Sequence, residues 1–337
     1  MATRSLNRSL QAARATKQDE FFTQLPDIEK ELRHYAAHFR KKVIFCNCDD
    51  PRISKFFHYF AYNFERLQLK QLITTCFQNA SADLFSTRTS ESGKYLVYEG
   101  DKDGDRQPGP DETEIFDLAG DGDFRSPECV RLLEHAGVVV TNPPFSLFRE
   151  HVQQLIKYEK KFLIVGNHNA ISYKEIFDLI RRDKIWLGYE HPTKFMVPDH
   201  YEMREGRSWR DPDGTNWRSL GNACWFTNLD IRKRHEDLIT IRSYEADKYP
   251  EYDNFRAIEV SKYKDIPCDY DGVMGVPITF LEHYNPEQFE IVGSDYEVQQ
   301  GVLPELLKTG WSGKTDRGYV NGRRLFARIF VRRLPIK

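Results

Sequence analysis

The segment Asn142-Pro143-Pro144-Phe145 carries the clearest chemistry in the sequence. It follows three valines at residues 138–140, a run typical of a strand buried on both faces of a parallel sheet. The two prolines have no N–H to donate and push the preceding residue out of helical geometry, so strand pairing ends at Asn142. Ligands bind at the carboxyl ends of strands in open α/β sheets. The segment therefore predicts an active site at the end of a central strand.

These residue types favour catalysis at an exocyclic amino group of a base or an amide. Such a nitrogen is a poor nucleophile because its lone pair is delocalised into the neighbouring π-system. The side-chain oxygen of Asn142 and the carbonyl of Pro143 can each accept one N–H of that group, which localises the lone pair in the transition state. Phe145 can stack on the ring. The alternative is a simple turn after a core strand.

Charge is unevenly distributed along the 337 residues, although the net charge is only −2. Residues 311–337 carry eight basic residues against the single acid Asp316, whereas residues 99–123 are strongly acidic. A nucleic-acid partner therefore cannot be argued from the overall charge, and any basic surface must be local. Residues 1–18, which include Arg14 and no acid, are expected to form a flexible basic arm near phosphates; an inert tail and a transit peptide are the alternatives.

Cysteine spacing and hydropathy give no sign of a disulfide framework, a zinc site or a membrane span. The six cysteines lack paired spacing, so they are expected to be reduced thiols of a cytosolic protein. No run of about 18 apolar residues is present. Residues 101–112 imitate a calcium loop, but Arg106 stands where the sharp turn needs glycine. A solvated loop is expected there, and no metal.

Hydrophobic periodicity predicts alternating helices and strands through the first two thirds of the chain. Helices are expected at residues 26–39, 54–64, 126–133, 148–156 and 171–182, and strands at residues 42–47, 71–76, 138–140, 161–166, 184–188 and 223–227. Residues 79–112 are expected to form an inserted loop with a hairpin at residues 94–98. The alternation predicts an α/β fold with a mixed, mostly parallel sheet and helices on both faces.

A polar segment, residues 189–220, mixes basic and aromatic side chains. Such mixing suits a strand-end loop that contacts phosphates and bases, with a merely exposed loop as the alternative. Later strands are expected at residues 275–280, 290–293 and 324–330, and on the last of these arginines alternate with apolar residues, so that one face is core and the other basic. The candidates for nucleic-acid contacts are Arg14, Lys194, Arg204, Arg207, Arg210, Arg218, Arg323 and Arg324.

A series of motifs gives the sequence a family resemblance. The motifs are, in order, residues 19–23 (Asp-Glu-Phe-Phe-Thr), 46–51 (Cys-Asn-Cys-Asp-Asp-Pro), 120–126 (Gly-Asp-Gly-Asp-Phe-Arg-Ser), 141–149 around the Asn-Pro-Pro-Phe segment, 166–171 (Gly-Asn-His-Asn-Ala-Ile) and 293–294 (Gly-Ser). From about Asp19 to the C-terminus the chain resembles the EcoRI-type adenine-specific DNA methyltransferases, which depend on S-adenosylmethionine. The resemblance implies a Rossmann-like methyltransferase fold with a C-terminal target-recognition region.

The resemblance also implies a site for S-adenosyl-L-methionine. The Asp49-Asp50 turn would hold the amino-acid part or the ribose, and Asp123 would accept a hydrogen bond from the cofactor's adenine amino group. The chain departs from the wider methyltransferase pattern in two places: its first strand lacks the usual Gly-x-Gly turn, and its second strand ends without the expected acid. The residues expected against the cofactor are Phe21, Thr23, Cys46, Asn47, Asp49, Asp50, Asp123, Phe124 and Asn142.

For the substrate, the resemblance implies an adenine flipped out of duplex DNA, because its N6 cannot be reached inside the stack. Asn142, Pro143, Pro144 and Phe145 would hold this base, and Trp225 or Phe226 would close its other face. The expected reaction is in-line transfer of the sulfonium methyl group to adenine N6, without a covalent intermediate or a metal.

Motif order implies a flexible arm at residues 1–18, a catalytic domain at residues 19–230 with a DNA-contacting loop at 189–220, and a target-recognition region at residues 231–337. The family name suggests a GAATTC-like site in double-stranded DNA, a cognate restriction endonuclease acting on the same site, and a cytoplasmic enzyme encoded by a bacterium or phage. Two alternatives remain: a methyltransferase for ribosomal-RNA guanine or protein glutamine with the same Asn-Pro-Pro-Phe chemistry, and a DNA-binding module without catalysis.

Overall fold

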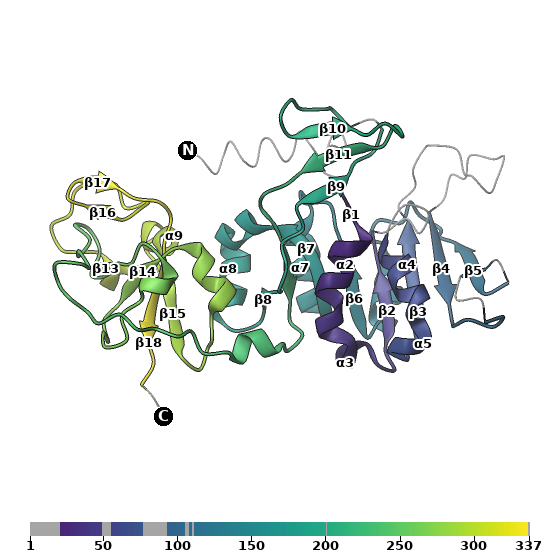
Figure 1. The fold of residues 1–337 in the computed structure, drawn as a ribbon, viewed down its shortest axis with the longest axis horizontal. Helices are drawn as coiled ribbons and strands as arrows, with labels where there is room; N and C mark the ends of the chain where they lie inside the picture. The colour runs from purple at the N-terminus through teal and green to yellow at the C-terminus, as the bar shows by residue number, and fades with distance from the viewer. Residues whose placement is uncertain are drawn as a thin grey trace. The chain divides into compact units, whose positions relative to one another are not determined.

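The computed structural model describes residues 21–48, 55–76, 93–104, 108–109, 111–199 and 201–335. These residues divide into two compact units (Figure 1). The first unit comprises the residues up to Ile176 together with Leu187–Leu229, and the second comprises Phe177–Trp186 together with the residues from Asp230 onward. The predicted basic arm with Arg14 and the Asp49-Asp50 turn lie outside the described residues.

A mixed sheet of eight strands forms the centre of the first unit. Its strands are β2 (Val43–Cys46), β3 (Gln71–Cys76), β4 (Lys94–Tyr98), β5 (Thr113–Asp117), β6 (Val138–Thr141), β7 (Lys161–Asn167), β8 (Trp186–Leu187) and β12 (Ala223–Thr227), in the order β5-β4-β3-β2-β6-β7-β12-β8. The four neighbours β3, β2, β6 and β7 are parallel, and the pairings of β4 with β3 and β5 and of β12 with β7 are antiparallel. The expected large sheet is confirmed, but it is parallel only in its middle.

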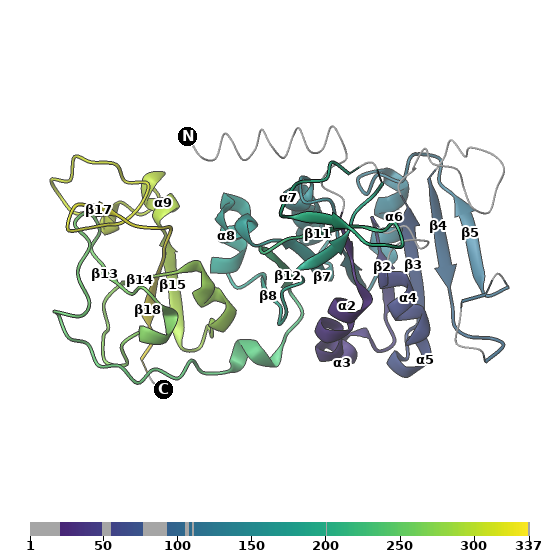
Figure 2. The same cartoon turned by 45° about the horizontal axis from the view of Figure 1, so that its top comes forward.

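Helices cover this sheet, which is why every residue of β2 and β6 is buried. The helices are α2 (Leu25–Leu32), α3 (Ala36–Phe39), α4 (Lys55–Tyr62), α5 (Phe64–Leu67), α6 (Pro127–His135) and α7 (Phe148–Lys157), with 3-10 turns η1 (Arg33–Tyr35) and η2 (His168–Ser172); most of α8 (Lys174–Arg181) belongs to the second unit. Figure 2 shows α2 to α5 on one side of the sheet and α6 and α7 on the other. No helix among the described residues is long and apolar enough to cross a membrane.

Local signals start two helices where the sequence predicts them. Pro26 lies in the first turn of α2, and the Ser126 hydroxyl caps α6 by accepting from the backbone N–H of Cys129 at 3.2 Å. The hairpin expected at residues 94–98 differs: β4 pairs with β3 as well as with β5 and so extends the main sheet. That pairing joins segments far apart in the chain, which a local pattern does not reveal.

A smaller antiparallel sheet in the first unit replaces the loop expected at residues 189–220. Its strands are β1 (Phe22–Thr23), β9 (Lys194–Met196), β10 (Ser208–Arg210) and β11 (Asn216–Ser219), in the order β1-β9-β11-β10 (Figure 1). One edge strand thus comes from the beginning of the described chain. A strand of two residues has no periodicity, so the sequence could not show that β1 completes this sheet.

The second unit is built on a sheet in the order β13-β14-β18-β15, with a separate β16–β17 pair. Its elements are β13 (Ile258–Glu259), β14 (Met274–Val276), β15 (Phe289–Ser294), β16 (Tyr319–Val320), β17 (Arg323–Arg324), β18 (Ile329–Arg333), α9 (Asp295–Gln299), η3 (Arg232–His235), η4 (Tyr263–Asp265), η5 (Ile278–His283) and η6 (Pro304–Leu306). The strand expected at residues 324–330 begins only at Ile329, because Arg328 turns inward to the buried carboxylate of Glu259. The strand expected at 275–280 ends at Val276, before Pro277.

Glu31 is a fully buried carboxylate on α2 that ties this helix to the chain after β8. It accepts from the backbone N–H groups of Tyr189 at 3.0 Å and Glu190 at 2.7 Å, and from the Tyr35 hydroxyl at 2.6 Å. A buried carboxylate is tolerated only when donors surround it in this way.

We expect Glu31→Gln to lower the free energy of unfolding by about 2 kcal/mol or more, because one acceptor oxygen is lost and an NH2 group faces buried donors. Urea denaturation of both proteins measures the difference. Glu29→Gln, on an exposed position of the same helix, is the control and should stay within about 0.5 kcal/mol of the parent. Equal effects of the two substitutions would contradict the role of Glu31.

Candidate active site

The carboxyl ends of β2 and β6 meet at the centre of the large sheet. β2 lies between β3 on one side and β6 on the other, so the strand order reverses direction at β2. Open α/β sheets bind ligands at such a reversal. The Thr141 hydroxyl donates a hydrogen bond to the backbone carbonyl of Asn47, which fixes the two strand ends to each other. Asn142 comes directly after β6, at the position that the sequence predicts.

The N-terminal strand orients the carboxamide of Asn142. Its Nδ2 donates to the backbone carbonyl of Phe21 and to the Thr23 hydroxyl oxygen, the latter at 3.1 Å. Within the described part of the chain no group donates to Asn142 Oδ1. Because the nitrogen is held by the protein, the oxygen is left as an acceptor for a substrate.

Aromatic rings surround Phe21 beside this asparagine. Its ring centroid lies 5.2 Å from that of Phe145, 6.0 Å from Phe195 and 6.2 Å from Tyr201. Phe145 is therefore only 7% exposed, and Phe21 occupies one side of the ring that was expected to stack on a base. Sequence analysis did not select Phe195 or Tyr201; the only signal was their position in the aromatic and basic segment.

The buried imidazole of His151 contacts Asn47 at the end of β2. His151 Nε2 lies 3.2 Å from Asn47 Oδ1, and the Phe124 ring packs edge to face on His151 at 5.1 Å. Burial lowers the pKa of His151 to about 3, so the imidazole is neutral at physiological pH. Cys46 and Phe124 are themselves buried, which leaves their side chains little surface for a cofactor.

Asp123 is held by an arginine. Its carboxylate accepts from Arg125 Nε at 2.9 Å and from Arg125 Nη2 at 2.5 Å, and Arg125 Nη1 reaches Glu150 at 2.8 Å. These contacts, above all the hydrogen bond to Asp123, raise the pKa of the Arg125 guanidinium. The Asp123 side chain is 26% exposed, and it also accepts from the backbone N–H of Arg125 at 2.9 Å.

The acidic stretch that imitates a calcium loop gathers three carboxylates. Oxygen atoms of Asp101, Asp103 and Glu112 lie within 4.8 Å of one another. Glu112 also accepts from the backbone N–H of Gly109 at 3.1 Å and from that of Lys102, and these bonds lower its pKa. The Glu112 carboxylate thus binds backbone N–H groups of the loop and holds the loop together.

Comparison with known proteins decides the family. The family described as adenine-specific methyltransferase EcoRI matches residues 9–334. The chain belongs to this family. Type II methyltransferase M.EcoRI of Escherichia coli is 50% identical over 297 residues, which cover 87% of this chain and 90% of that protein. The predicted family and its adenine methyltransferase activity are confirmed.

Two Mycoplasma proteins are similar over almost their full length. Type II methyltransferase M.MgeORF184P of Mycoplasma genitalium is 36% identical over 334 residues, covering 96% of this chain and 98% of that protein. Type II methyltransferase M.MpnI of Mycoplasma pneumoniae is 33% identical over 329 residues, covering 95% and 96%. Among solved structures none matches the chain significantly.

Two residues that the resemblance placed against the target base lie inside the core of this methyltransferase. Trp225 and Phe226 on β12 have no exposed surface. The Trp225 ring packs on Phe56 at 5.9 Å, and the Phe226 ring packs on Phe148 at 4.8 Å. The prediction that either one closes the face of the base is wrong, because β12 lies between β7 and β8 inside the sheet.

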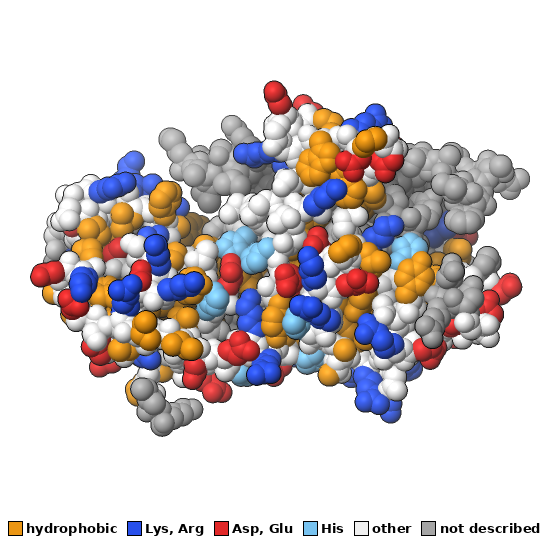
Figure 3. Space-filling model, viewed as in Figure 1, with side chains coloured by type: hydrophobic (Ala, Val, Ile, Leu, Met, Phe, Trp, Pro, Cys, Tyr) orange, Lys and Arg blue, Asp and Glu red, His pale blue; other side chains and the backbone are white. Residues whose placement is uncertain are grey.

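The smaller sheet gathers most of the basic residues that sequence analysis selected. Lys194, Arg210 and Arg218 lie on its strands, and the exposed Arg204 and Arg207 lie just before β10. Figure 3 shows basic, acidic and apolar side chains together in this region, at the top of the view. Lys194 Nζ lies 3.7 Å from the centroid of Trp217, on the sheet face opposite Thr23, the β1 residue that contacts Asn142.

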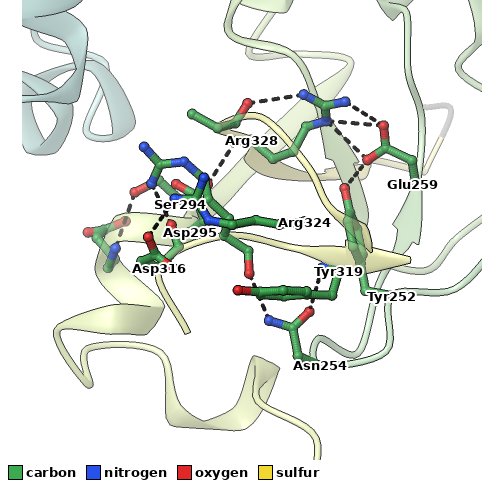
Figure 4. A network of polar contacts seen from close by, with 12 residues as sticks. Tyr252, Asn254, Glu259, Ser294, Asp295, Asp316, Tyr319, Arg324 and Arg328 are labelled. Carbon is green, nitrogen blue, oxygen red and sulfur yellow. Dashed lines mark hydrogen bonds and ion pairs between the residues drawn. The ribbon is translucent and has the colours of Figure 1, made fainter. Parts of the chain in front are cut away.

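Arg323 and Arg324 lie on β17 in the second unit, in different surroundings. Arg324 Nη2 pairs with Asp316 at 2.6 Å, next to a network in which Arg328 binds Glu259 (Figure 4). Arg323 is exposed, and no carboxylate of the described residues pairs with it. Part of the C-terminal positive charge is therefore neutralised internally, and Arg323 is the more available of the two predicted DNA contacts.

The buried imidazole makes stability pH-dependent. His151 has a pKa of about 3 in the folded protein against about 6.5 in an unfolded chain, so below pH 6.5 the unfolded state takes up the proton first and stability falls. This single group should cost about 2 kcal/mol between pH 7 and pH 5. We expect His151→Gln to show a correspondingly flatter decline in urea denaturation at the two pH values. Parallel pH profiles for parent and variant would contradict this assignment.

Proposed function

We propose that this methyltransferase transfers the methyl group of S-adenosylmethionine to N6 of an adenine flipped out of duplex DNA, within a short specific site. The observation that carries the proposal is the fixed orientation of Asn142, whose Nδ2 is held by Phe21 and Thr23 and whose Oδ1 is left as an acceptor. An amino group with two N–H bonds is the partner that such an acceptor and the neighbouring Pro143 carbonyl suit.

The chain's own residues supply orientation and charge stabilisation. Asn142 Oδ1 and the Pro143 carbonyl each accept one N6–H bond, which draws the nitrogen toward tetrahedral geometry and localises its lone pair. Positive charge develops on N6 only in the transition state, so these acceptors strengthen as the methyl group is transferred. Phe145 borders the base, and the aromatic side chains around Phe21 exclude water from it.

The strand ends fit S-adenosylmethionine. When bound, the cofactor supplies an electrophilic sulfonium methyl group. Asp123, exposed in part, would lie against the cofactor's adenine amino group, and Asn47 is held at the carboxyl end of β2 by Thr141 and His151. Phe21 and Thr23 contact Asn142 and so lie at the junction of the two proposed ligands.

DNA is the substrate that the family favours. The smaller sheet with its exposed arginines would contact the duplex beside the flipped base, and the second unit, with Arg323, would read a GAATTC-like sequence. The similar proteins are all named Type II methyltransferases, which supports a restriction-modification role with a cognate endonuclease. Methylation of RNA guanine or protein glutamine is not favoured, because the matching family is adenine-specific over nearly the whole chain.

Incubation of the protein and labelled S-adenosylmethionine with unmethylated genomic DNA, followed by sequencing that reports modified bases, tests the proposal. N6-methyladenine should appear in one short motif. Label found in RNA or protein, with none in DNA, would refute the proposed substrate.

We expect Asn142→Ala to slow single-turnover methylation by about 100-fold or more, because an acceptor that acts in the transition state is removed. Cofactor affinity, measured by calorimetry without DNA, should change little. Asn169→Ala, at an exposed strand-end asparagine after β7, is the matched control and should keep the parental rate. A fully active Asn142→Ala protein would rule out the proposed role.

A further inference from the structure

Arg218, on β11, is a half-buried cation without a counter-charge. Its guanidinium carbon lies 5.5 Å from the ring centroid of Phe21 and 5.4 Å from that of Tyr201. Its Nε is inaccessible to solvent and has no hydrogen-bond partner, and no carboxylate in the described part of the chain pairs with it. Burial lowers the pKa of the group, as expected for a charge removed from water without compensation.

Strand register places this guanidinium on the side of the smaller sheet that faces the catalytic motif. Arg218 pairs with Phe195, and Phe195 pairs with Thr23, so the three side chains lie in one row on one face of the sheet. The Thr23 hydroxyl accepts from Asn142 Nδ2, and the Phe21 ring contacts Phe145. Arg218 is therefore two strands away from the residue that contacts Asn142.

The other cations of this sheet differ from Arg218 in their surroundings. Lys194 alternates with Phe195 and so points to the opposite face, where its Nζ lies over Trp217 and 4.0 Å from Asp211. Arg210 Nε donates to the carbonyl of Gly214 at 2.9 Å. Arg207 is exposed to water. Of these described basic residues, Arg218 alone is partly buried and also lacks an anion or hydrogen-bond acceptor among the described residues.

A partly desolvated guanidinium is unfavourable until an anion approaches it, and its planar fork matches the oxygens of a phosphate. We propose that Arg218 binds the DNA phosphate adjoining the flipped adenine and positions that nucleotide against Asn142 and Phe145. The inference rests on the proposed function. A phosphate is favoured over the cofactor's carboxylate because Arg218 lies over the ring of Phe21, and that ring contacts Phe145 of the segment proposed to hold the base.

The test compares Arg218→Gln with the control Arg131→Gln, at an exposed position of α6. Each protein is assayed in single turnover on a duplex carrying its methylation site, with either normal phosphates or one neutral methylphosphonate beside the target adenine. Arg218→Gln should slow methylation about tenfold to 100-fold on normal DNA, the range expected for a hydrogen bond between charged groups. Arg218→Lys, which keeps the charge but not the fork, should fall between.

The decisive result is non-additivity. The methylphosphonate should slow the parent and Arg131→Gln about as much as Arg218→Gln slows methylation of normal DNA, and it should slow Arg218→Gln no further. The melting temperature of Arg218→Gln should not fall, since a partly desolvated charge with no ion pair among the described residues is removed, and its affinity for S-adenosylmethionine without DNA should match the parent.

Full additivity of the two changes at each phosphate beside the adenine would overturn the inference, as would a selective loss of cofactor affinity. These outcomes presuppose that the parent protein methylates DNA. Absence of any DNA methylation by the parent would instead refute the proposed function, so the two failures are distinguishable.

Discussion

The orientation of one carboxamide is the constraint on which the proposed active site depends. Asparagine can present either an acceptor oxygen or a donor NH2 group to a ligand, and only the oxygen can localise the lone pair of an amino nitrogen. The backbone carbonyl of Phe21 and the hydroxyl oxygen of Thr23 accept hydrogen bonds from the NH2 group of Asn142. The oxygen is therefore the group that Asn142 presents to a ligand. The Thr141–Asn47 and His151–Asn47 contacts keep the supporting strand ends in place.

Buried charges in the two units show how structural and ligand-directed groups differ. Glu31 is surrounded by backbone and hydroxyl donors, and Arg328 is matched by the carboxylate of Glu259 (Figure 4). Both charges are satisfied within the folded chain. Arg218 has aromatic contacts but no anion among the described residues, which is the basis for proposing that it binds a ligand.

Features encoded in neighbouring residues were predictable from the sequence. The three valines and two prolines define β6 and its end, and the Ser126-Pro127 pair defines the start of α6, because each signal acts within a few residues. Contacts between distant segments were not predictable. The sequence could not place β1 beside β9, bury Trp225 against Phe56, or turn Arg328 toward Glu259, since each depends on a partner that only the fold brings near.

The pairing of β1 with β9 also bears on the order in which the protein becomes competent during synthesis. β1 is made before the parallel strands β2, β3, β6 and β7, yet its partner strand β9 and the next strand, β11, are made only after them. Contacts so distant in sequence form late, because the intervening chain must first be ordered. A nascent chain can thus form these four parallel strands while Asn142 remains unoriented, and the proposed catalytic geometry is deferred until residues near 219 have emerged.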